Sequence, residues 1–237
     1  AALRGVDRAF LMSAQPVGSA PEPTHAQRLA AAARRAGVGH LVLLSVYSGG
    51  QGDDILATWH GRTEAAVTSS GPDWTVLRPG RFMSNALHWR DMVARGDTVH
   101  VPFAYRPSAS IDPADIAAVA RVALTTDEHR GRAYQMSGPA VLTPADELRV
   151  LGDVLGRDLH LVEPPTEVTR AGMLRSGMSP ALVEAALART TDSDEGTEIH
   201  DTVDRVTGRP ATTFRQWALR NADQFHGGDV HRPQHTG

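Results

Sequence analysis

The chain has 237 residues, of which 41% are hydrophobic and 22% are charged, and this composition is typical of a globular protein with one sizeable core or two small ones. Its formal net charge of -3 at pH 7 provides no strongly basic face, so we expect a small-molecule ligand and no direct nucleic-acid partner. The absence of cysteine excludes disulfides, thiolate metal sites and cysteine nucleophiles.

Lysine is also absent, because all 24 basic residues are arginine. This excludes Schiff-base chemistry and a lysine that assists proton transfer. No apolar run approaches the roughly 20 residues of a membrane span, and the first residues lack the apolar core of a secretion signal. We therefore expect a cytoplasmic protein without a membrane partner.

The first third of the chain alternates strand and helix patterns. Thr24, followed by Gln27 three residues later, predicts a capping box at the start of a helix that ends at Gly37. The continuously apolar run 41–44 predicts a central parallel strand, because both faces of such a strand are covered by helices. The predicted elements are a strand at 8–13, the helix from Thr24, the strand 41–44, a helix with apolar positions Ile55, Trp59, Ala66 and Val67, and a strand at 74–77.

The remaining elements predict one more strand of the same sheet, followed by a region of mostly helical pattern. From residue 159 onwards the pattern indicates a smaller, mostly helical cap. The predicted elements are a helical segment at 82–95, an extended piece at 99–103, a helix at 112–124, a strand at 133–136, a helix at 143–156, a strand at 159–162, helices at 167–175 and 180–189, a loop at 190–198 and a helix at 212–225.

These elements predict an α/β fold with a Rossmann-like parallel sheet and a small C-terminal cap. We divide the chain into an incomplete nucleotide-binding domain at 1–157, a cap at 158–226 and a flexible tail at 227–237. Ligands of open parallel sheets bind beyond the carboxyl ends of the strands. The segments 45–52 and 78–85 are therefore the first places to look for a site.

The segment from His60 to Asn85 carries two motifs that we recognise. It reads H-x-x-T-E at 60–64 and S-G-x-x-W-T-V-L-R-P-G-x-F-M-x-N at 70–85. This combination resembles the NmrA-like branch of the atypical short-chain dehydrogenase/reductases, which includes NAD(P)H:quinone oxidoreductase type 2, azoreductase-like enzymes and redox-sensing regulators. Further similar segments are 8–13 and 41–45, which look like the fourth and fifth strands of that family, and V-T-G-R-P at 206–210 with Phe214, which looks like its C-terminal signature.

The resemblance implies that NAD or NADP is the cofactor, but the family's Gly-rich turn is missing from this sequence. In a dinucleotide fold that turn brings backbone N–H groups to the pyrophosphate. The loop 48–52 lacks the required glycine spacing, and we interpret it as a flexible active-site loop. We expect a fragment of a longer product rather than a natural short form, because the strand at 8–13 would otherwise expose an edge built to be central.

Two residues are candidates for catalysis, namely Tyr47 and His60. Related reductases pair a tyrosine with a lysine four residues later, but this sequence has Gln51 there, so that acid mechanism is excluded. Tyr47 either bonds a substrate carbonyl or packs on its neighbours. His60 either donates a proton to a quinone or imine or forms a hydrogen bond with Glu64 one helical turn later.

The residues that end the predicted strands are expected to contact the cofactor, as the resemblance implies. Neither a metal site nor a hydrolase motif is expected, because the sequence contains no H-E-x-x-H and no G-x-S-x-G. The predicted cofactor contacts are Met12, Ser13 and Pro16 after the first strand, Ser45 and Val46 after the second, and Pro79, Gly80 and Phe82 after the third.

The function implied by the resemblance is NAD(P)H-dependent hydride transfer to a quinone-like, conjugated carbonyl or imine small molecule. One alternative is a redox-sensing regulator that binds the dinucleotide without turnover, which the absence of lysine favours. The other is a cofactor-free binding remnant, which the missing Gly-rich turn favours. The sequence does not fix the substrate, the choice between NAD and NADP or the oligomeric state, and a homodimer is among the options.

Overall fold

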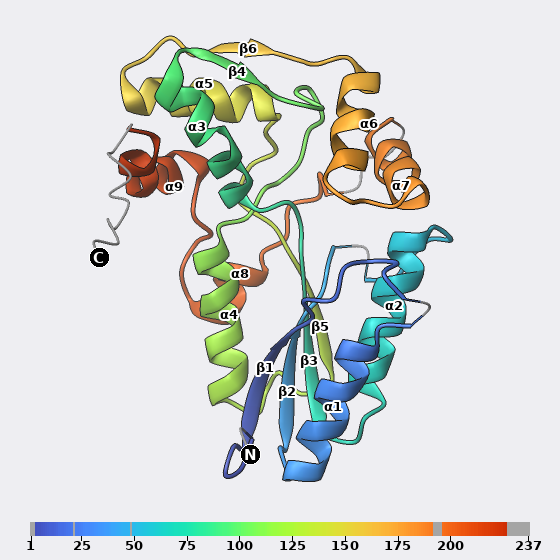
Figure 1. The fold of residues 1–237 in the computed structure, drawn as a ribbon. Coiled ribbons are helices and arrows are strands. Elements are labelled where there is room, and N and C mark those ends of the chain that lie inside the picture. Colours follow the sequence, from blue (N-terminus) through green and yellow to red (C-terminus); the bar gives the residue numbers. More distant parts are fainter. Residues whose placement is uncertain (1–2, 21, 48, 192–195, 227–237) are drawn as a thin grey trace, which may run out of the picture.

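The fold is described from a computed structural model, which covers residues 3–20, 22–47, 49–191 and 196–226. Its centre is a four-stranded parallel sheet with the strand order β1-β2-β3-β5 (Figure 1). The predicted parallel sheet is confirmed. Its strands are β1 (Arg8–Met12), β2 (His40–Leu44), β3 (Asp73–Pro79) and β5 (Arg132–Met136).

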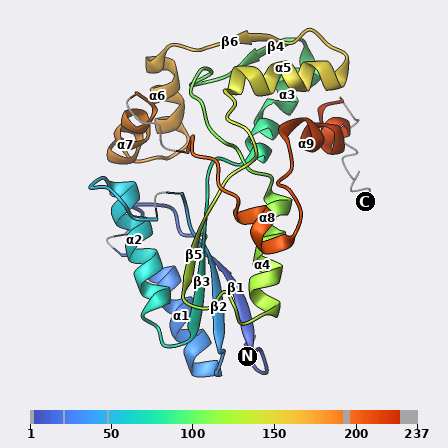
Figure 2. The same ribbon diagram turned by 180° about the vertical axis from the view of Figure 1, so that it is seen from behind.

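Helices cover both faces of this sheet. Helices α1 (Thr24–Ala36) and α2 (Ile55–Thr68) pack on one face, and α4 (Pro113–Thr125) packs on the other, where α8 (Thr202–Thr207) lies against it (Figures 1 and 2). Alternate residues of a strand point to opposite faces, and β2 therefore contributes to two cores. Leu41 and Leu43 pack toward α1 and α2, whereas Val42 packs with the α4 side.

The helix termini agree with the predictions at some positions and differ at one. Helix α1 ends as expected at Gly37, which adopts a left-handed conformation with φ of 79°. The predicted capping box at Thr24 is wrong, because the helix is already under way there and Pro23 is the N-cap. The hydroxyl of Thr24 instead donates to the side-chain carbonyl of Gln15 at 3.4 Å.

The predicted helix at 82–95 is split into two pieces. It consists of a 3₁₀ segment, η1 (Met83–Trp89), followed by α3 (Arg90–Arg95). Met83, Ala86 and Trp89 are all buried at a spacing of three residues, which is the repeat of a 3₁₀ helix. The burial of this face in the cap explains why the tighter helix forms here.

The cap contains a small second sheet that the sequence did not predict. Strand β4 (Thr98–His100) pairs in parallel with β6 (His160–Val162). Around it pack α5 (Pro144–Leu155), α9 (Phe214–Asn221) and η2 (Ala222–Phe225). The core of the cap draws on residues from both sides of the predicted boundary at 157, because Met83 and Leu148 belong to the same cluster as Trp217 and Phe225. The division into domains remains a prediction.

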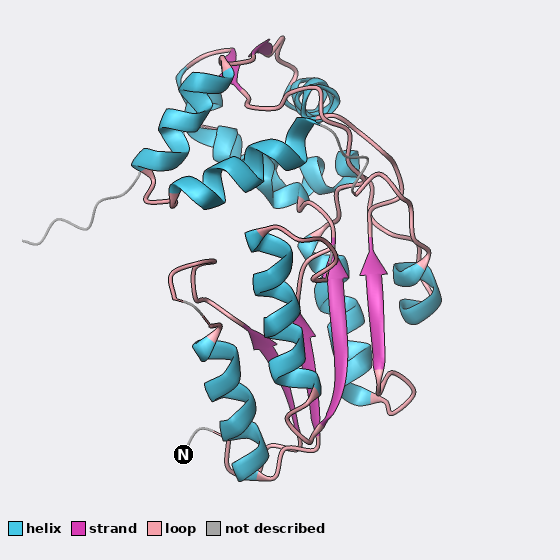
Figure 3. Ribbon diagram, turned by 90° about the vertical axis from the view of Figure 1, so that its right-hand side faces the viewer, coloured by secondary structure: helices cyan, strands magenta, loops and turns pink. Residues whose placement is uncertain are grey.

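Two further helices, α6 (Thr166–Arg175) and α7 (Pro180–Thr191), form the other side of the cap and stand above α2 (Figure 1). Strand arrows in Figure 3 point toward the cap, so the carboxyl ends of the strands face it. The short helix α8 was not predicted. Within the described residues, no helix is both long and apolar enough to span a membrane.

Candidate active site

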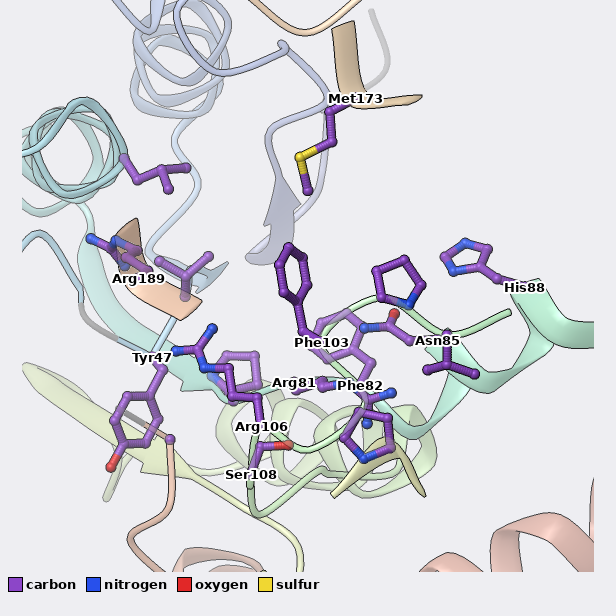
Figure 4. A pocket seen from close by; sticks show the side chains of 18 of the residues that line it. Tyr47, Arg81, Phe82, Asn85, His88, Phe103, Arg106, Ser108, Met173 and Arg189 are labelled. Atoms are coloured by element: carbon purple, nitrogen blue, oxygen red, sulfur yellow. The ribbon is translucent and has the colours of Figure 1, made fainter. Parts of the chain in front are cut away.

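The strand ends lie side by side beneath the cap. Met12 is in register with Leu44, and Leu44 with Leu77, so the residues that follow these strands share one edge of the sheet. The amide of Ser45 donates to the carbonyl of Leu77 at 2.8 Å and extends this alignment by one residue. A cleft of about 780 Å³ opens at this edge, between the sheet and the cap (Figure 4). The expected convergence of the strand ends is therefore confirmed.

Most of the predicted site residues line this cleft, and three do not. Met12, Ser13 and Pro16 lie at the end of β1, outside the lining, and the side chain of Met12 is exposed. The roles of all ten residues remain predictions. The predicted residues that line the cleft are Ser45, Val46, Tyr47, His60, Pro79, Gly80 and Phe82.

The cap supplies a wall that the sequence did not reveal. Phe103 projects into the cleft in Figure 4 and, among the described residues, is the single non-glycine with a positive φ, at 55°. Such backbone strain is uncommon for a bulky residue and tends to occur at functional sites. The strained backbone of Phe103 cannot be read from the sequence. The other lining residues that were missed include Arg81, His88, Trp89, His100, Arg106, Ser108, Met173 and Arg189.

A buried carboxylate organises the sheet side of the cleft. The Oγ of Ser45 donates to Oε1 of Glu64 at 2.5 Å, and Arg78 donates to both oxygens at 3.0 and 2.6 Å. Glu64 is buried, and two-pronged pairing with a guanidinium is a strong way to satisfy such a charge. Within the described chain no hydrogen bond joins Glu64 to His60, so that interpretation of His60 is not supported. The H-x-x-T-E motif thus serves to tie α2 to β2 and β3.

The glycine-rich loop after β2 packs closely on its surroundings. A Cβ placed on Gly49 would lie 2.2 Å from Nε of Arg78, and one on Gly50 would lie 2.4 Å from Cα of Gly61. Both glycines have positive φ. The described part of this loop therefore lies against Arg78 and helix α2. The flexibility of the loop remains a prediction.

His60 lines the cleft from α2 and is half-buried. Burial lowers its pKa below 6.5, the nearby Glu64 acts in the opposite direction, and Arg189 adds to the lowering. The imidazole is therefore mainly neutral at pH 7. A neutral imidazole can donate a hydrogen bond to a substrate atom without adding a charge to the cleft.

Arg189 lines the same cleft as His60 and connects the cap to α2. Its Nε donates to Oδ2 of Asp54 at 2.7 Å, and this hydrogen bond is the main reason that the pKa of Asp54 is lowered. Asp54 is also the N-cap of α2, where its side chain accepts from the amide of Ala57 at 2.8 Å. One carboxylate thus holds the start of α2 and the end of α7 together.

Tyr47 lines the cleft with its ring, but its hydroxyl points away from the labelled residues of the opposite wall (Figure 4). That hydroxyl lies 3.0 Å from Nε2 of His200 and 3.4 Å from Oε2 of Glu198. The amide of His200 donates to Oγ of Ser137 at 2.8 Å, which fixes this segment on the end of β5. The tyrosine is therefore part of a polar contact between the sheet and the chain that leads to α8.

Two buried hydroxyls, one after β1 and one in the chain between β4 and α4, could form hydrogen bonds with a bound ligand. The hydroxyls of Ser13 and Ser108 are buried and have no hydrogen-bond partner within the described residues. Gly80 lines the cleft, where a Cβ would lie 3.7 Å from the carbonyl oxygen of Met136 and 3.9 Å from Cδ2 of Tyr47. The two buried hydroxyls fit a polar ligand such as NAD(P). Among the described residues, no three His, Asp or Glu side chains are placed to hold a metal ion.

Comparison with known proteins agrees with this fit. The family profile described as NAD(P)H-binding matches residues 1–127. A Streptomyces griseus protein named (4-alkanoyl-5-oxo-2,5-dihydrofuran-3-yl)methyl phosphate reductase is 39% identical over 94% of this chain and 79% of its own length. The NAD(P)H azoreductase of Xenophilus azovorans is 33% identical over 95% of this chain and 79% of its own length.

Solved structures give the same fold. The Escherichia coli quinone oxidoreductase QOR2 in complex with NADPH superposes with a TM-score of 0.75 over 92% of this chain and 77% of that protein, at 23% identity. At this identity the likeness shows the fold alone, while the family match and the closer relatives show the cofactor class. The chain belongs to the NAD(P)H-binding family, in the NmrA-like group of atypical short-chain dehydrogenase/reductases, and its cofactor is NAD or NADP.

Proposed function

We propose that this protein uses NAD(P)H to reduce a small molecule with a polarised, conjugated acceptor, such as a quinone, an unsaturated carbonyl compound or an imine. The observation that carries the proposal is the cleft where the ends of β2 and β3 meet the strained Phe103 of the cap. In an open parallel sheet this is the position in which a nicotinamide ring would meet a substrate.

The relatives support this class of acceptor. The name of the Streptomyces griseus relative describes an unsaturated lactone that carries an alkanoyl group and a phosphate, and the Xenophilus azovorans relative is named for the reduction of azo compounds. Both names describe reduction of a polarised or conjugated group. A quinone-like acceptor for this chain fits the same pattern.

The residues of the cleft have distinct parts in the proposed reaction. When bound, NAD(P)H supplies the hydride. Pro79, the last residue of β3, and Gly80 and Phe82 in the turn that follows flank the reacting ring. Phe82 and Phe103 provide apolar walls that exclude water, which holds the substrate in a productive position. The neutral imidazole of His60 donates a hydrogen bond to the substrate atom that gains negative charge during hydride transfer, and Tyr47 is the second candidate for this role. That atom then takes its proton from solvent water.

The test is reduction of a panel of quinones, azo dyes and unsaturated lactones by the purified protein, followed through the loss of NADPH or NADH absorbance. We expect turnover that requires the cofactor. In a double variant, His60→Ala with Tyr47→Phe, turnover should fall while NADPH binding persists. Unchanged turnover in this variant would exclude both residues as hydrogen-bond donors to the substrate, and absence of turnover with every acceptor would contradict the reductase proposal.

A second candidate function is a redox-sensing regulator that binds NAD(P)H without turnover. The absence of lysine favours it, because the usual partner of a proton-donating tyrosine is missing. Titration with NADPH and NADH separates the candidates. Binding with turnover supports the reductase, binding without turnover supports the regulator, and absence of binding would leave only a cofactor-free binding protein.

A further inference from the structure

A second hollow adjoins the cleft in the cap. It has a volume of about 470 Å³ and lies between α6 and the chain around β4. Its walls include Pro102, Pro164, Val168 and Met173, so most of its surface is apolar. We call this hollow the α6 groove.

The α6 groove is continuous with the cleft. His100, Pro102 and Met173 line both hollows, so they form a common wall at the junction. Met173 reaches from α6 toward Phe103 in Figure 4. A methionine is a suitable side chain for such a junction, because it is flexible and adapts to an apolar ligand. A molecule that reacts over the strand ends could therefore extend into the groove without leaving the protein surface.

The walls of both hollows are mostly apolar, but the hollows differ in the basic side chains that line them. Arginine and histidine side chains line the cleft, and no Asp or Glu does so among the described residues. The groove instead presents apolar side chains that remain open to solvent, and Val168 is 53% exposed. Exposed apolar residues that line a groove beside a site favour an apolar ligand.

We propose that the α6 groove binds an aliphatic chain carried by the substrate, so that the substrate is amphiphilic, with a conjugated polar ring in the cleft and an alkyl or acyl chain along α6. This inference rests on the proposed reductase function and adds the substrate class. The aliphatic chain would cover the apolar surfaces of Val168, Met173 and the prolines and exclude water from them. This burial contributes to affinity in proportion to the apolar area covered.

Gly172 offers a way to close the groove. It lines the groove from within α6, and a Cβ placed on it would have no neighbour closer than 4.0 Å, where the nearest atom belongs to Arg175. A leucine there would fill the groove with little disturbance of the fold, and it would also favour the helix over glycine. Glu167 is a matched control position, because it lies on the same helix, is exposed and does not line the groove.

The experiment uses 1,4-naphthoquinones with 2-alkyl chains from methyl to octyl. For the wild-type protein we expect kcat/KM to rise about twofold for each added methylene until the groove is filled, since a fully buried methylene would contribute about fourfold. Most of the change should appear in KM. Gly172→Leu should abolish the dependence on chain length, whereas Glu167→Leu should retain it.

Dissociation constants of the same quinones, measured by quenching of tryptophan fluorescence, test the groove without any turnover. Trp89 lines the cleft and is a suitable reporter. If the quinones bind with chain-length dependence but are not reduced, the reductase proposal fails and the groove proposal stands. The groove proposal would be overturned if affinity and kcat/KM of the wild-type protein did not change with chain length. It would also be overturned if the dependence on chain length were equal in wild type and Gly172→Leu, or if both leucine variants lost it to the same extent.

Discussion

His60 combines a position on the cleft wall with a pKa that burial has lowered. If the neutral imidazole donates the hydrogen bond, activity depends on the deprotonated form. Protonation at low pH would place a positive charge beside Arg189, which already contributes to the lowered pKa. The pH dependence of the reaction therefore reports directly on the role of this side chain.

We expect kcat/KM to rise with pH through an apparent pKa below 6.5 and then to level off. His60→Gln should remove this inflection and lower kcat about a hundredfold, because a positioned donor is lost. Steady-state rates between pH 5 and pH 8 provide the measurement. His160→Gln on β6 is the control and should retain the wild-type profile. An inflection that persists in His60→Gln would assign the titration to another group.

At the scale of elements, the contact between Gly50 and Gly61 joins the loop after β2 to helix α2. It allows the two backbones to approach closely because neither residue has a side chain. The loop carries Tyr47 at its start and Asp54 at its end, so this contact also helps to fix one wall of the cleft.

Gly50→Ala should destabilise the protein for two reasons, namely a positive φ of 92° and a clash at 2.4 Å with Cα of Gly61. Gly131→Ala is the matched control, since its φ of 68° is also positive but nothing lies within 4 Å of the new Cβ. We expect about 1 kcal/mol for the control and about 2–4 kcal/mol for Gly50→Ala, measured by urea unfolding. Equal losses would show that the glycine contact contributes nothing.

The elements that the sequence predicted best are those whose conformation depends on their own residues and on their immediate neighbours in the chain. The apolar run of β2 and the terminating Gly37 of α1 are such cases. The split of 82–95 into η1 and α3 depends on burial of Met83 and Trp89 in the cap, which is a tertiary effect. The residues after β2 and β3 were located because parallel strands end at one edge, whereas Phe103, Arg106 and Met173 come from distant segments and lack such a signal.

At the scale of the whole molecule, a buried histidine links stability to pH. His40 at the start of β2 is fully buried, its Nε2 lies 2.9 Å from Oγ1 of Thr75, and its Nδ1 has no partner within the described residues. Burial lowers its pKa below 6.5 in the folded state, and the charges of Arg130 and Arg8 add to this. Protonation would place an unpaired charge in the interior, so the unfolded chain binds protons more readily.

The free energy of unfolding should therefore be constant well above pH 6.5 and should decline as the pH falls below 6.5 toward the lowered pKa values of His40 and His60. Urea unfolding at intervals between pH 8 and pH 5 measures this decline. It should be smaller in a His40→Gln variant, although that variant starts from a lower stability because the bond to Thr75 changes. A wild-type stability that rises on acidification would contradict the assignment.

The path of the backbone between sheet and cap has a mechanical consequence. Following the described elements, the chain passes from β3 to η1, from β4 to α4, from β5 to α5, from α7 to α8 and from α8 to α9. Four of these connections lie wholly within the described residues, and they link the two layers on either side of the cleft. Several parallel connections resist a wide hinge-like opening of the cleft far more than a single connection would. We therefore expect substrates to enter at the open ends of the cleft. A small sliding movement of the cap would admit them, and the cap would not need to lift away from the sheet.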